Sequence, residues 1–309
     1  MSHLAMSQLA WNPSPSGATR LPAAAPSLQR WSSPRSILVV TDGQNEEMLL
    51  FHTMLQAKQS RARIVLAHLT NPGAETQPPG TDSIQRRLQW VGIHCQSTIL
   101  SGPAEVSVPS LAARSGADRV LIATQSERLP GGLSPSNVTE RLLPLLQVPA
   151  CLIGNGVPPP PKCAAPVKRI ALALSLQTRN EVALRFACEL CREWNATLTV
   201  VHVFSPQERQ PAEHLRTPTA VDSQLPDWIR KKTPISCPLE ISVRCGDPAR
   251  EIAAHAAKSR QDLILMCSPG PAHARATTEA GVLKTVLSEA TCPVMVTGRG
   301  LEQVQRASQ

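Results

Sequence analysis

The chain has 309 residues, a formal net charge of +8 at pH 7 and 42% hydrophobic residues, but only 3% aromatic residues and no tyrosine. This length suits two domains of ordinary size, and the low aromatic content requires aliphatic cores, which are typical of parallel strands buried on both faces. We expect no membrane contact, since no apolar run reaches roughly 18 residues, and no secretory signal, since the N-terminus lacks that pattern.

The first half of the sequence alternates between strand and helix patterns, after a leader of residues 1–34 that is rich in Ser, Pro and Ala and is predicted to be disordered. Asn45 is expected to cap the first helix, and Pro144 to kink or shorten the last one. Short apolar runs predict strands at residues 35–40, 63–69, 95–100, 119–123 and 150–153. Helical spacing predicts helices at 45–59, around 84–91, around 106–112 and from about 137.

The second half follows a run of four prolines, which predicts a stiff, extended connector. Its strands are expected at 169–174, 197–204, 239–244, 262–267 and 294–297, and its helices around 182–191, at 227–231, at 248–259 and from about 281. The predicted organisation is a first domain at 35–156, a linker at 157–167, a second domain at 168–300 and a C-terminal tail at 301–309.

The two halves repeat each other. Matching residues recur at a constant distance, which is 134 residues for His68 and His202 and 144 residues for Gly102 and Gly246, Asp118 and Asp262, and Pro149 and Pro293. The change of ten residues lies between the second and third predicted strands, where the second half has the longer loop. Offsets that stay constant across turns and strands indicate a duplication.

These repeated residues resemble the universal stress protein family. The resemblance is carried by Ile37 to Gly43, by His68 and His202, by Gly102-Pro103-Ala104 and Gly246-Asp247-Pro248, by the strands after Asp118 and Asp262, and by Val148 to Ile153 and Cys292 to Val296. It covers nearly all of residues 35–298 and is more specific in the second half. It implies an α/β fold of two tandem flavodoxin-like units, also termed adenine-nucleotide α-hydrolase-like. Each unit is expected to hold a five-stranded parallel sheet in the order 3-2-1-4-5, with helices on both faces.

The resemblance also implies how the two units associate. Members of the family typically dimerise through their fifth strands, so a tandem chain is expected to make this pairing internally, with a homodimer as an alternative. His68 and His202 end buried strands and are expected to be hydrogen-bonded structural residues; a place near a nucleotide or at the interface of the units is the alternative.

A nucleotide-binding branch of the family has three glycines in the loop after the fourth strand, the last followed by Ser or Thr. Glycines allow phosphates to approach backbone N–H groups at a helix N-terminus. The corresponding positions are Ala123, Ser126, Ser136 and Asn137 in the first half, and Cys267, Gly270, Ala280 and Gly281 in the second. Only Gly270 keeps a family glycine. The acid after the first strand is Asp42, beside Gly43, in the first half, but the second half has Ser175 there.

Neither half therefore carries a complete nucleotide site. We expect a non-enzymatic protein of the stress response that acts by regulatory binding to an unidentified protein partner, with no certain cofactor. The alternative is a version that binds ATP or a related adenine nucleotide. A weaker alternative is association with nucleic acid, which the net charge permits but the scattered Lys and Arg do not favour. No residue is assigned a catalytic or metal-binding role.

Cysteine usage favours a reducing compartment. The nine cysteines are an odd number, and several lie within apolar patterns, which indicates buried, reduced thiols in a cytoplasmic protein. Cys188 and Cys191 lie one turn apart on the apolar face of a predicted helix, so core packing is the favoured interpretation. A redox or zinc pair is the alternative, and a zinc site would need two more ligands that no nearby spacing supplies.

Overall fold

The computed structural model describes residues 34–43, 45–70, 81–124, 138–159, 165–175, 181–204, 218–235, 237–267 and 277–297. The first half contains β1 (Ser36–Thr41), α2 (Glu46–Ser60), β2 (Arg63–Thr70), α3 (Thr81–Trp90), β3 (Cys95–Ser101), α4 (Ala104–Arg114), β4 (Arg119–Ala123), the short turns η1 (Val138–Leu142) and η2 (Leu143–Leu145), and β5 (Ala150–Ile153). The second half contains β6 (Arg169–Ala173), α6 (Glu181–Trp194), β7 (Thr197–Phe204), α7 (Pro218–Lys232), β8 (Leu239–Cys245), α8 (Pro248–Lys258), β9 (Leu263–Met266), α9 (Thr277–Glu289) and β10 (Val294–Val296).

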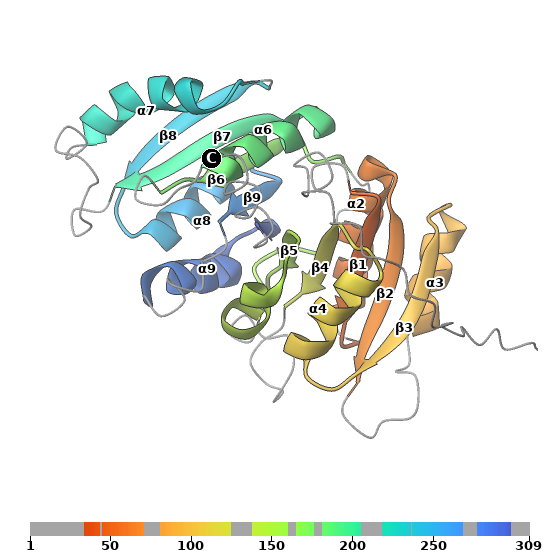
Figure 1. The fold of residues 1–309 in the computed structure, drawn as a ribbon. Helices are drawn as coiled ribbons and strands as arrows, with labels where there is room; N and C mark the ends of the chain where they lie inside the picture. Colours follow the sequence, from red (N-terminus) through yellow and green to blue (C-terminus); the bar gives the residue numbers. More distant parts are fainter. Residues whose placement is uncertain are drawn as a thin grey trace, which may run out of the picture.

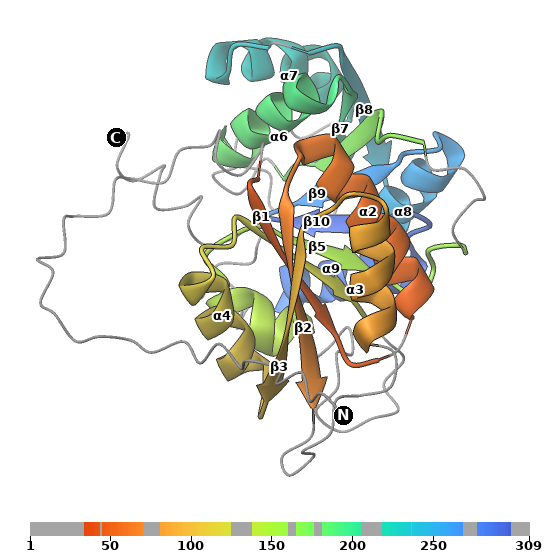
Figure 2. The ribbon, with the colours of Figure 1, turned by 90° about the vertical axis from the view of Figure 1, so that its right-hand side faces the viewer.

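All the strands join one ten-stranded sheet in the order β3-β2-β1-β4-β5-β10-β9-β6-β7-β8. Pairing is parallel within each half, whereas β5 and β10, which lie side by side at the centre (Figure 2), pair antiparallel. Met295 lies opposite Cys151 in this pair. The predicted α/β class with a mainly parallel sheet is confirmed. The five strands of each half lie within this one sheet, because the fifth strands, β5 and β10, hydrogen-bond to each other within one chain, as expected for a tandem protein.

Helices cover both faces of this sheet (Figures 1 and 2). Alternate residues of a strand point to opposite faces, so Ile37 and Val39 join one apolar cluster while Leu38 and Val40 join the other. The first cluster takes buried residues from α2, α3, α6 and α7, and the second from α4, η1, α8 and α9. Because each cluster contains residues of both halves, the core is continuous across the junction.

The duplication is visible in one carboxylate of each half. Asp118 Oδ2 accepts hydrogen bonds from the backbone N–H groups of Arg35 and Ser36, at 3.0 and 3.2 Å. Asp262 Oδ2 accepts the same pair of bonds from Lys168 and Arg169, at 2.8 and 2.9 Å. Each carboxylate thus anchors the first strand of its half beside the fourth.

Three helix predictions need correction. The helix expected at 227–231 is α7, which begins at Pro218; proline is tolerated at a first helical position, and buried Leu225 and Ile229 hold α7 in the core. The helix expected from about 137 is only a π turn and a 3-10 turn, in keeping with the shortening expected from Pro144. Asn45 precedes α2 but makes no side-chain cap; it adopts the left-handed conformation, with φ of 49°.

Candidate functional site

The first predicted site lies at the carboxyl ends of β1 and β4. These strands are neighbours in parallel register, so Asp42 and Gly43 come to the same sheet edge as Ala123. Gly43 has φ of +86°, a conformation that favours glycine, and its N–H group donates to Thr41 Oγ1 at 3.0 Å. Ala123 is buried, and Ser126, Ser136 and Asn137 lie outside the described residues.

Next to Ala123, a threonine ties the ends of two strands together. The backbone N–H and the hydroxyl of Thr124 both donate to the carbonyl oxygen of Ile153, at 2.9 and 3.2 Å. The start of the loop after β4 is therefore bound to the end of β5, and the sheet edge has a defined shape where a ligand would approach.

The second predicted site begins at the carboxyl ends of β6 and β9. The Leu174 carbonyl lies 2.8 Å from His202 Nδ1, and the Leu174 N–H donates to the Val201 carbonyl at 2.9 Å. His202 is buried and hydrogen-bonded to the backbone, as expected for a structural residue. Cys267 is half-buried at the end of β9.

The remaining residues of the second site are only partly described. Gly270 and the side chain of Ala280 lie outside the described residues. Gly281 is exposed and lies in α9, which begins at Thr277 and so starts earlier than the predicted position near Gly281. A Cβ atom added to Gly281 would meet nothing within 4 Å. The described surroundings of Gly281 therefore leave room for a side chain.

The two predicted sites lie at opposite edges of the sheet. Val296, at the carboxyl end of β10, pairs with Ala150 at the amino end of β5. Since all strands within a half run parallel, the carboxyl ends of β1 and β4 face the edge opposite to the carboxyl ends of β6 and β9. Asp42 in one half therefore cannot complement the loop after Cys267 in the other.

A cavity of about 230 Å³ lies at the junction of the two halves. It is lined by Phe51, His52 and Gln56 of α2, by Trp194 at the end of α6, by Gln261, and by residues 157–159 of the connection. Pockets for drug-sized ligands usually measure about 300–1,000 Å³, so this cavity is small for a nucleotide. The sequence does not reveal this cavity, because its walls come from segments that are distant in the chain.

A buried cation lies behind this cavity wall. Arg119 is 0% exposed, and its Nη1 donates to Gln56 Oε1 at 3.0 Å. Its guanidinium lies 5.2 Å from the ring centroid of Trp194, within cation–π range. Burial lowers the pKa of Arg119 to about 10, and burial also lowers the pKa of His52 to about 4. The only sequence signal for this group is an arginine at the start of an otherwise apolar strand.

The described residues contain neither a metal-binding cluster nor a membrane-spanning helix. No cluster of three or more His, Cys, Asp or Glu side chains among them is arranged to hold a metal ion. Within the same residues, no helix combines the length and the hydropathy needed to cross a lipid bilayer.

Comparison with known proteins assigns the second half of the chain to a family. The family model of the universal stress protein family matches residues 166–298. No curated protein matches the chain. Solved structures with a similar fold include a universal stress protein from Archaeoglobus fulgidus DSM 4304, with 14% identity and a TM-score of 0.60 over 89% of this chain and 99% of that one. Another is a putative universal stress protein from Pseudomonas aeruginosa UCBPP-PA14, with 14% identity and a TM-score of 0.57 over 90% and 99%.

At this identity the solved structures demonstrate a shared fold, whereas the family model rests on the sequence itself. Two halves with the same strand order meet at their fifth strands in this chain. Residues 166–298 therefore belong to the universal stress protein family, and the first half of the chain repeats the fold of that family in tandem.

Proposed function

We propose that this protein is a non-enzymatic, tandem universal-stress-type protein that acts in the stress response by regulatory binding to a protein partner. The observation that carries the proposal is the antiparallel pairing of β5 with β10. Because of this pairing, the carboxyl ends of the strands in the two halves lie at opposite edges of the sheet. The first half keeps the acid, Asp42, and the second half keeps the glycine, Gly270. The two incomplete nucleotide sites therefore cannot combine into a complete one.

The same pairing bears on assembly. In this family the fifth strand is the usual dimer contact, and here each fifth strand is occupied by the other half of the chain. A homodimer would therefore use a different surface. We place the domain boundaries at 35–156 and 168–300, with 157–167 as linker, because β5 ends at Ile153 and β6 begins at Arg169. We place the protein in the cytoplasm on its cysteine usage, since the eight described cysteines form no disulfide.

The alternative function is adenine-nucleotide binding by the first half. It is supported by Asp42 and Gly43 at the end of β1, beside the end of β4, which is where parallel α/β sheets place ligands. Ser126 and Ser136 replace glycines with small residues, so they alter the phosphate loop only mildly. ATP would be the ligand in this version.

A thermal-shift titration with Mg-ATP, ADP and cyclic AMP separates the two. A nucleotide present at 100 times its Kd stabilises the folded state by about 2.7 kcal/mol, which raises the Tm measurably. We expect no rise in Tm, and phosphate release from ATP no faster than in buffer. A rise in Tm that disappears in Asp42→Ala, while the Tm of the unliganded variant is unchanged, would establish the alternative instead.

Nucleic-acid association, which the net charge of +8 permits, is tested separately. Binding through phosphate contacts weakens steeply with salt. We expect the protein to leave a heparin column at low salt; retention that persists to moderate salt and scales with duplex length in a gel-shift assay would contradict the partner-binding function.

A further inference from the structure

β8 forms one outer edge of the ten-stranded sheet, next to β7 (Figure 1). Its inner side pairs in parallel with β7, and no described segment of the chain pairs with its outer side. Every residue of β8 is half-buried or exposed, whereas β7 is buried from Leu198 to Phe204. An unpaired strand edge presents backbone N–H and C=O groups that can bond another strand. Within the described chain, β8 is therefore open to a further strand.

Backbone bonds at the two ends of β8 show which of its groups point outward. The Leu198 N–H donates to the Pro238 carbonyl at 2.9 Å, and the Gly246 N–H donates to the Phe204 carbonyl at 3.2 Å. In a strand, the N–H and C=O groups of one residue point to the same side, and those of the next residue point to the opposite side. The even-numbered residues therefore bond β7. The outward groups belong to Leu239, Ile241, Val243 and Cys245.

The other outer edge of the sheet, β3, is partly occupied. The Ile64 N–H donates to the His94 carbonyl at 2.8 Å, so the carbonyl of the next residue, Cys95, points outward. The Nε2 groups of Gln85 and Gln89, both on α3, donate to this Cys95 carbonyl at 3.4 and 3.2 Å. A further strand along β3 would have to displace these two side chains.

The charged side chains of β8 are placed symmetrically. Glu240 and Arg244 lie at equal distances in the sequence before and after Ser242, and alternate residues of a strand share one face. This face carries α8: Ser242 Oγ lies 3.5 Å from His255 Nδ1, and Arg244 Nε donates to Glu251 Oε2 at 2.6 Å. Charged residues on an edge strand usually discourage pairing. Here their signs are opposite, so a second β8 running the other way meets a complementary set of charges.

We propose that β8 is a self-association edge, which pairs antiparallel with β8 of a second copy of this chain about a two-fold axis at Ser242. In this register the outward groups of Ile241 meet those of Val243 in the other copy, and the outward groups of Leu239 meet those of Cys245. These are the hydrogen-bonded pairs that an antiparallel ladder requires, and each pair exchanges two bonds. The whole of β8 takes part, and the sheets of the two copies become continuous.

The charges select this register among the symmetric ones. Glu240 of one copy lies opposite Arg244 of the other in a non-hydrogen-bonded pair, where the Cα atoms are about 4.5 Å apart and the side chains are closest. Each Arg244, which Glu251 of its own chain already binds, then lies between two carboxylates. An axis at Ile241 or Val243 also matches outward groups, but it shortens the ladder and separates Glu240 from Arg244. The pairing is independent of the function proposed above.

The test is sedimentation velocity of the full-length, reduced chain at increasing concentration. A pairing of edge strands buries less surface than the standard interface of about 1,600 Å², so we expect a Kd of about 1–100 μM. The mass should rise from 33.2 kDa towards twice that value between about 1 and 200 μM protein. A wild-type chain that stays monomeric over this range would overturn the proposal, whatever the variants do.

Charge reversal tests the register. Glu240→Arg alone, or Arg244→Glu alone, places like charges opposite each other twice in each dimer and should raise the Kd at least about tenfold. The double variant Glu240→Arg, Arg244→Glu restores opposite charges and should recover most of the lost affinity. Single variants that associate like the wild type, or a double variant weaker than either single one, would overturn the proposed pairing.

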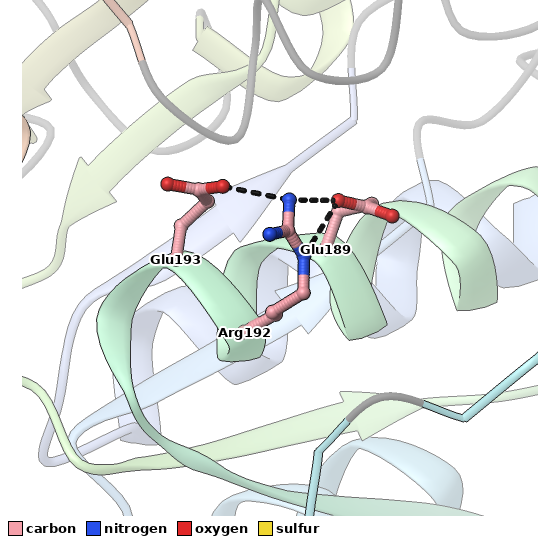
Figure 3. Close-up of polar contacts among 3 residues, drawn as sticks. All are labelled: Glu189, Arg192 and Glu193. Atoms are coloured by element: carbon pink, nitrogen blue, oxygen red, sulfur yellow. Dashed lines mark hydrogen bonds and ion pairs between the residues drawn. The ribbon is translucent and has the colours of Figure 1, made fainter.

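The matched controls make the same changes of charge on α6. This helix buries Cys188 and Cys191 in the core, as predicted, and exposes its charged groups. Arg192 Nη2 lies 2.8 Å from the Glu189 carboxylate and 2.7 Å from the Glu193 carboxylate (Figure 3). Glu189→Arg and Arg192→Glu should leave the Kd unchanged. An equal loss of association in these controls would assign the effect to net charge and overturn the pairing.

A cysteine on the proposed axis gives an independent measurement. Ser242→Cys places two thiols opposite each other in the dimer, so oxidised glutathione should produce a disulfide-linked dimer on a non-reducing gel. In the wild type, exposed Cys245 lies opposite Leu239 and should cross-link much less. Equal cross-linking of the variant and the wild type would contradict an axis at Ser242.

Discussion

Gly154 follows β5 in the first half, at a point where the backbone touches α9 of the second half. A Cβ atom at this position would lie 2.0 Å from the carbonyl oxygen of Leu287, whereas ordinary contacts of such an atom lie at 3.4–4 Å. Gly154 is not among the described residues with positive φ, so alanine can adopt its backbone conformation. Gly154→Ala therefore tests the close approach alone, and it requires α9 to move by more than an ångström.

Overpacking of this kind costs about 1–3 kcal/mol, occasionally more, and a rigid backbone carbonyl favours the upper end. For 309 residues, each with an unfolding entropy of about 2.1 cal/mol/K, a loss of about 3 kcal/mol corresponds to a fall in Tm of roughly 5 °C. Urea unfolding followed by far-UV circular dichroism measures the loss directly. The matched control is Gly281→Ala within α9, where a Cβ meets nothing within 4 Å; it should stabilise by about 0.5–1 kcal/mol. An unchanged midpoint for Gly154→Ala would refute the close packing of α9 on the junction.

Two further predictions follow from buried polar groups. Burial lowers the pKa of His52 from 6.5 to about 4. As the pH falls, His52 therefore takes up a proton in the unfolded state before it does so in the folded state. The contribution of His52 to stability is full above pH 6.5 and is lost as the pH falls towards 4. The loss of stability amounts to about 3 kcal/mol, since each pKa unit corresponds to about 1.4 kcal/mol. Urea unfolding midpoints at pH 7 and pH 4 should show that His52→Gln loses less stability than the wild type on acidification. An equal loss in the variant and the wild type would contradict this role of His52. Asp118→Ala removes two backbone hydrogen bonds to a buried carboxylate and should cost about 2–4 kcal/mol. Asp262→Ala should cost less because its bonds are exposed, and equilibrium unfolding that ranks the pair in reverse would count against this account.

Elements with a strong local signal were predicted well. The strands are short apolar runs, and each strand range in the structure agrees with its prediction within about two residues. Asp118 and Asp262 were paired by offset alone, and the structure gives them the same hydrogen bonds. The prediction failed for α7, because Pro218 and Pro226 suggest a loop when read locally, while burial of Leu225 and Ile229 against the core holds the helix.

The candidate site was predicted only in part, since a family pattern identifies positions but not their mutual placement. It located Asp42 and Ala123 at one sheet edge, which the parallel register of β1 and β4 explains. It did not reveal the buried Arg119 beside Gln56 and Trp194, because the three residues come from β4, α2 and α6.

The sequence by itself indicated that a strand–helix unit was duplicated and that, of the glycine positions marked by the family resemblance, only Gly270 holds a glycine, because periodicity, offsets and residue identity can be read without the fold. Only the tertiary structure decided that β5 and β10 join antiparallel, which turns the two carboxyl edges away from each other, and that buried Arg119 lies beside Gln56 and Trp194. Both features depend on which segments, distant in the sequence, pack against each other and exclude water. That is a property of the whole folded chain.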